Sequence, residues 1–122
     1  MSTVGGFDHW DEIRPLKIWD GVVARAWGGS EATLVAVTLD PGAVVPEHRH
    51  PNEQNGVLVR GSMTFRIGEE TRELRPGSTW VIPGDVPHEV SAGPEGAFAI
   101  ELFAPPRADW AGLERLEPGP PA

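Results

Sequence analysis

The sequence has no cysteine, which excludes disulfide bonds and thiolate metal sites. It also has no apolar run near the roughly 18 residues that a membrane-spanning helix needs. Its first residues, MSTVGGFDHWDE, contain acidic side chains and no apolar stretch, which is unlike a secretory signal. We therefore expect a cytoplasmic protein that does not enter a membrane.

Basic residues are scarce. The chain has 18 Asp and Glu residues against 10 Lys and Arg residues, for a net charge of −8 at pH 7. Nucleic-acid binding depends mainly on cations that neutralise phosphates, so no nucleic-acid partner is expected. An acidic balance without long charged blocks indicates little more than a soluble surface.

Helical patterns are nearly absent. No Gly- and Pro-free segment of twelve residues repeats its apolar residues every 3.6 positions, and only RADWAGLERL at 107–116 suggests a short helix. Short β-branched segments alternate with Gly and Pro turns instead. We expect strands over residues 22–27, 33–39, 43–48, 54–60, 62–67, 71–74, 79–82, 88–91 and 97–103. Strands at this spacing predict an all-β sandwich or barrel.

A chain of 122 residues fits a single domain with its own core. We expect a barrel core at about 20–105, an N-terminal arm at 1–15 and a flexible C-terminal tail at 114–122, which ends in EPGPPA.

Two of the four histidines lie close together in GAVVPEHRHPNEQNGVLVRG at 42–61. His48 and His50 would share one face of a strand, as two metal ligands must. Alternation puts Gln54 on the same side and Glu53 on the other, and a barrel could bring His88 across from the chain segment after IPGDVP. Paired histidines are also common as surface or hydrogen-bonded residues, so spacing alone leaves both interpretations open.

The spacing around these histidines resembles the two motifs of the cupin family. The first family motif is Gly-x5-His-x-His-x3,4-Glu-x6-Gly, and the second is Gly-x5-Pro-x-Gly-x2-His-x3-Asn. The matching residues here are Gly42, His48, His50, Gln54 and Gly61, then Gly77, Pro83, His88 and Ala92. Three positions differ from the family: Gln54 replaces Glu, Asp85 replaces Gly, and Ala92 replaces Asn.

The resemblance implies a double-stranded β-helix, or jelly-roll barrel, and a homodimer. It also implies one divalent transition metal per chain (Ni, Zn, Fe, Mn, Cu or Co), with His48, His50, Gln54 and His88 as ligands. Three imidazoles and an amide leave the ion its full double charge, which suits Lewis-acid chemistry. The two-His-one-carboxylate iron oxygenase site needs a carboxylate that this set lacks.

The stretch AFAIELFAPPRADW at 97–110 adds candidate catalytic residues. Glu101 and Phe103 share a strand face. Either this face is exposed to solvent, or it lines the barrel and Glu101 acts there as a general acid/base. Arg107 would hold a substrate carboxylate in a bidentate grip. Arg60 shares strand parity with Gln54 and is a further substrate-binding candidate.

The segment HPNEQ, with Glu101, Phe103 and Pro105-Pro106-Arg107, resembles pectin-degradation cupins that ketonise unsaturated monouronates. That resemblance implies a metal-dependent isomerase or lyase-like enzyme acting on a small anionic, carbohydrate-like substrate such as an unsaturated uronate. Two alternatives stay open: a non-catalytic module that binds a small ligand or metal, and a metal-dependent dioxygenase. Phe65, Trp80 and Met63 are expected in the core.

Overall fold

The fold is a β-barrel. The computed structural model describes residues 5–120. Its strands are β1 (Leu16–Trp19), β2 (Val22–Gly28), β3 (Thr33–Leu39), β4 (Val44–His48), β5 (Glu53–Ile67), β6 (Glu70–Leu74), β7 (Thr79–Ile82) and β8 (His88–Ala104). Two short 3-10 helices are η1 (Trp10–Glu12) and η2 (Ala108–Gly112). The expected all-β barrel is confirmed, and η2 supplies the short helical turn expected near the C-terminus.

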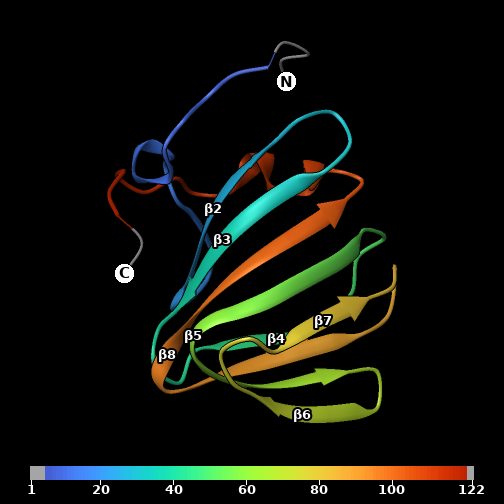
Figure 1. The fold of residues 1–122 in the computed structure, drawn as a ribbon. Helices are drawn as coiled ribbons and strands as arrows, with labels where there is room; N and C mark the ends of the chain where they lie inside the picture. The colour runs from blue at the N-terminus through green and yellow to red at the C-terminus, as the bar shows by residue number, and fades with distance from the viewer. Residues whose placement is uncertain (1–4, 121–122) are drawn as a thin grey trace.

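Two long strands, β5 and β8, run through both layers of the barrel (Figure 1). In one layer the order is β1-β2-β3-β8-β5, with β7 on the outer side of β5. In the other layer the first half of β8 pairs with β4, and the second half of β5 pairs with β6. All of these pairings are antiparallel, so the sheet folds over itself in the manner of a jelly roll.

Two predicted strand ends were wrong. The breaks expected at Gly61 and at residues 93–96 do not end strands; they are the corners at which β5 and β8 bend from one layer to the other. The pairing register shifts between Leu58 and Arg60 and again between Gly61 and Met63. Gly61 has φ +84°, and a Cβ there would lie 2.0 Å from the carbonyl oxygen of Gly96. A bulge with glycine bends a strand without ending its pairing.

The barrel interior is apolar. Side chains alternate along β7, where Trp80 and Ile82 are buried and Thr79 and Val81 are exposed. Leu58, Ile82 and Val35 are the largest side chains that are fully buried. Burying each such side chain contributes roughly 1.5–3 kcal/mol, so these layers hold the barrel closed around its interior. Phe65, Trp80 and Met63 lie in this core, as expected.

The chain before β2 and the chain after η2 meet at β1, a strand that the sequence did not predict. The backbone N–H of Lys17 donates to Glu114 at 2.9 Å, and that of Leu116 donates to Pro15 at 2.7 Å. Part of the segment predicted as a C-terminal tail thus adds to the edge of β1. No helix among residues 5–120 is long and apolar enough to cross a bilayer.

Candidate metal centre

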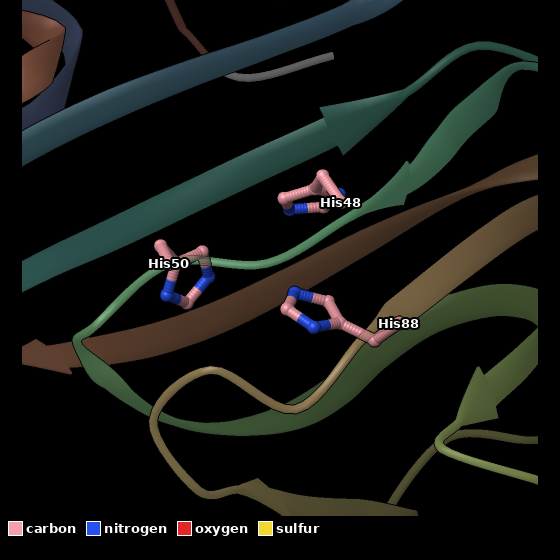
Figure 2. Close-up of side chains that lie close together, drawn as sticks. All are labelled: His48, His50 and His88. Carbon is pink, nitrogen blue, oxygen red and sulfur yellow. The ribbon is translucent and has the colours of Figure 1, made fainter.

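Three histidines converge inside the barrel (Figure 2). His48 ends β4 and stands directly opposite His88, the first residue of β8, while His50 lies in the loop after β4. Their ring centroids are 4.3 to 5.6 Å apart, and a nitrogen from each ring lies within 4.8 Å of the others. A single ion with ligands at about 2.1 Å reaches such a group after small side-chain movements.

The loop before His88 is tied to the loop that carries His50. The backbone N–H of Asp85 donates to the His50 carbonyl at 2.8 Å. Asp85 has φ +64°, in the left-handed region that costs most residues energy, which explains why the family motif has glycine there. Ala92, in place of the motif's Asn, is buried in the core. Neither departure disturbs the placement of the histidines.

Backbone carbonyls fix the tautomer of each imidazole. The Nδ1 atoms of His48, His50 and His88 lie 2.8, 3.0 and 2.8 Å from the carbonyl oxygens of residues 46, 52 and 86. A carbonyl only accepts, so each Nδ1 carries the proton and each Nε2 offers a lone pair. Histidines that bind metal are oriented by this kind of second hydrogen bond.

Gln54 connects the histidines to Glu101. Its side-chain Nε2 donates to Glu101 Oε2. A carboxylate needs a donor, so the amide oxygen must face the other way, and Oε1 lies 3.0 Å from His50 Nε2. Two lone pairs therefore meet with no proton between them. Two ligands at right angles around one ion, each about 2.1 Å from it, lie at about this separation.

The imidazoles are neutral at pH 7. Burial lowers the pKa of all three histidines. Positive charge lowers it further, chiefly that of Arg107 for His48 and His50, and that of the two neighbouring imidazoles ahead of Arg107 for His88. The pKa of His88 falls to about 4. His88 Nε2 is buried without a hydrogen-bond partner among the described residues. Neutral nitrogens with inward lone pairs, one of them orphaned, fit a divalent transition metal and need no proton release to bind it.

Glu101, Phe103 and Arg107 line the same cavity as His48, His88 and Gln54. Burial raises the pKa of Glu101, while hydrogen bonds from Gln54 and Trp80 oppose the rise. The free space in this arrangement is about 60 Å³, enough for a few water molecules. A larger ligand needs the side chains at the mouth to move.

Arg107 is fixed at the cavity wall. Its guanidinium carbon lies 4.8 Å from the Phe103 ring centroid and 4.4 Å from that of Trp110. Nε and Nη2 donate to the two carboxylate oxygens of Asp109 at 2.9 and 2.8 Å. Within residues 5–120, Nη1 makes no hydrogen bond, so the Nη1–Nη2 edge can still receive a carboxylate.

One candidate residue, Arg60, differs from its expected surroundings, and a second residue, Glu53, agrees with them. Arg60 does not line this cavity; it is exposed and stacks 4.7 Å over the Phe98 ring, because the bulge after Leu58 breaks the parity that linked it to Gln54. Glu53 is exposed and accepts from Asn55, as alternation indicates. Sequence reasoning did not find Asp109 or the indole N–H of Trp80, which donates to Glu101 at 3.0 Å.

Comparison with known proteins agrees with the geometry. The sequence model of the cupin domain (Cupin_2) matches residues 35–103. The chain is 28% identical over 103 residues to the pectin degradation protein KdgF of Dickeya dadantii, covering 82% of this chain and 93% of that protein. It is 31% identical over 101 residues to the dimethylsulfoniopropionate lyase DddW of Ruegeria pomeroyi, covering 82% of this chain and 64% of the lyase.

Solved structures extend the likeness. The structure of KdgF from Halomonas sp. has a TM-score of 0.79 and 29% identity, over 87% of this chain and 98% of that one. An RmlC-like cupin from Shewanella frigidimarina has a TM-score of 0.82 and 23% identity, over 91% of this chain and 100% of that one. With its jelly-roll barrel, its two motifs and its inward histidines, the chain belongs to the cupin family.

Proposed function

We propose that the protein is a metal-dependent enzyme of the isomerase or lyase type that acts on a small anionic, oxygen-rich metabolite. The observation that carries the proposal is the placement of Glu101. Its carboxyl group lies in the cavity and is joined to His50 through the Gln54 amide, and Arg107 lies on the wall of the same cavity. Such a set combines a metal position, a proton-transfer group and an anion anchor.

The metal ligands in this proposal are His48, His50, His88 and Gln54. A divalent ion held there would supply Lewis-acid polarisation of a substrate oxygen. Because burial raises the pKa of Glu101, this carboxyl group exchanges protons closer to neutral pH than an exposed glutamate does. The open Nη1–Nη2 edge of Arg107 binds the substrate carboxylate, and the Phe103 ring closes the wall beside it.

The relative named for pectin degradation supports an unsaturated uronate as the substrate. In the ketonisation of a 4,5-unsaturated uronate, one proton leaves a substrate oxygen and one arrives at a substrate carbon. Atoms and electrons balance within one molecule, so no oxidant or second substrate is required. Glu101 would move that proton while Arg107 keeps the carboxylate in place.

A second candidate is elimination from a small sulfonium acid, as in the lyase relative. The small cavity favours it. About 60 Å³ is free, and the lining includes the aromatic rings of Trp19, Phe65 and Trp80, which attract cations. Glu101 would then act as the base that removes a proton from carbon, and Arg107 would again hold the carboxylate.

The test begins with elemental analysis of untagged protein purified without chelator or added metal. About one divalent ion per chain is expected, and the protein is then assayed with an unsaturated uronate and with dimethylsulfoniopropionate. Glu101→Gln should lose turnover yet keep the metal, whereas the exposed control Glu53→Gln should keep both. Saturable binding without turnover of either compound would favour a binding module. Oxygen consumption with a redox metal would favour a dioxygenase.

We also propose a second copy of this chain as the partner. The N-terminal arm exposes Phe7 completely, and Trp10 and Trp27 are more than one-third exposed. Apolar side chains gathered in this way are typical of surfaces that another chain covers. Light scattering should give twice the chain mass, and Phe7→Ser should shift the protein towards the monomer.

A further inference from the structure

One row of residues crosses three strands at the cavity. Gly56 of β5 pairs with Trp80 of β7 on one side and with Glu101 of β8 on the other. Directly paired residues on neighbouring strands point to the same face. Trp80 and Glu101 therefore stand on the same face with Gly56 between them, two strand spacings apart, or about 9.5 Å.

The missing side chain of Gly56 lets the two residues meet. A Cβ at this position would lie 2.4 Å from Cε2 and Cζ2 of Trp80 and 2.5 Å from its Nε1, closer than real atoms approach. The indole thus lies flat across the glycine. Trp80 is only 6% exposed, and the Phe65 ring packs 5.2 Å from its own. Clamped in this way, the indole Nε1 donates to Glu101 Oε2 at 3.0 Å.

Both donors to Glu101 reach the same oxygen. Gln54 Nε2 and Trp80 Nε1 each donate to Oε2. Within the described chain, no residue donates a hydrogen bond to the second oxygen, Oε1. An oxygen that already accepts two hydrogen bonds is a poor site for a further proton, whereas the second oxygen is open to a ligand.

We propose that Gly56 and Trp80 are positioning residues that lock Oε2 of Glu101 and leave Oε1 as the atom that exchanges protons with the substrate. The inference rests on the proposed function and names the atom of Glu101 that transfers the proton. Oε1 takes the proton from a substrate oxygen and returns it to a substrate carbon, and the carboxyl group ends in its starting state. Gly56 has a catalytic consequence although it has no side chain.

The hydrogen bond can be tested without any substrate. In the full-length protein labelled with ¹⁵N at its indoles, the Trp80 signal is identified by its loss in Trp80→Phe. A hydrogen bond to a carboxylate moves an indole proton downfield. The Trp80 signal should therefore move upfield in Glu101→Ala and in Gly56→Ala, and it should stay in place in the exposed control Glu53→Gln. If the chemical shift of the Trp80 indole proton does not change in Glu101→Ala, the proposed hydrogen bond that fixes Oε2 is refuted.

The kinetic consequence is a selective loss of kcat. Trp80→Phe keeps a ring in the slot and removes only the donor, so kcat should fall about tenfold while KM changes less than about twofold. Gly56→Ala should show the same fall in kcat with little change in KM. If Gly56→Ala fails to fold, Trp80→Phe still tests the proposal. A folded Trp80→Phe with the kcat of the unchanged protein would refute the role of Trp80. Suppose that the unchanged protein turns over neither the unsaturated uronate nor dimethylsulfoniopropionate while the indole signal responds as expected. In that case the proposed function is refuted, and the hydrogen bond that fixes Oε2 is supported.

Discussion

The metal-free protein should lose stability as the pH falls from 6.5 towards 4, and His88 should account for a defined part of the loss. Burial lowers the pKa of this histidine from 6.5 to about 4. Between these values the unfolded chain carries a proton on His88 that the folded chain does not. Stability therefore rises with pH across this window and is lost as the pH falls.

The size of the effect follows from the shift. One pKa unit corresponds to 1.36 kcal/mol, so a shift of this size lowers the free energy of unfolding by about 3 kcal/mol near pH 4. His48 and His50 add losses of the same sign, because burial lowers their pKa values too. Carboxylates also titrate in this range, so the His88 part must be isolated by a variant.

The variant is His88→Asn, since the amide N–H can replace the donation of Nδ1 to the Val86 carbonyl and does not titrate. Urea unfolding is measured with a chelator present, from about pH 7.5 down to 4. The stability gap between the two proteins should narrow by about 3 kcal/mol over this range. His9→Asn replaces a histidine outside the barrel, at the exposed N-cap of η1, and is the matched control. Parallel curves for the unchanged protein and His88→Asn would refute the reasoning.

Three further outcomes are expected. His48→Ala should abolish stoichiometric metal binding while circular dichroism still reports the β fold. Full metal loading in that variant would refute the proposed set of metal ligands. Gln54→Glu should keep the metal but weaken carboxylate binding, because it cancels a positive charge and replaces the donor to Glu101 with a second carboxylate; unchanged affinity would count against Lewis-acid chemistry. Asp109→Asn should raise KM for a carboxylate substrate roughly five- to thirtyfold with kcat kept, because a charge-assisted pair orienting Arg107 is lost; an unchanged KM would show that the rings alone orient Arg107.

Much of the fold could be predicted because β-sheet structure leaves local signals. Alternating apolar residues and Gly or Pro turns marked most strands, and the spacing of His48, His50 and His88 indicated the cupin barrel. The corners could not be predicted from the same signals. Gly61 resembles a turn residue, yet it belongs to a bulge, because a distant strand keeps pairing on both sides of it.

The site, like the fold, has features that local sequence signals predict and features that depend on distant strands. Alternation put Gln54 with the histidines and Glu53 away from them, and the structure agrees. Alternation failed for Arg60, because one bulge reverses every face that follows it. The hydrogen bond from Trp80 to Glu101 was beyond sequence reasoning, since it depends on three strands in register and on a glycine in the middle one.

The long strand β8 also sets the order in which the protein can assemble. It pairs with β3, β4 and β5 and is shared by both layers of the barrel. A chain emerging from the ribosome therefore lacks the centre of both layers until the residues up to 104 are outside. His88 is the first residue of β8, so the three histidines also come together only at that stage. Metal capture thus follows the emergence of β8, and a nascent chain cut before β8 should neither fold nor hold an ion.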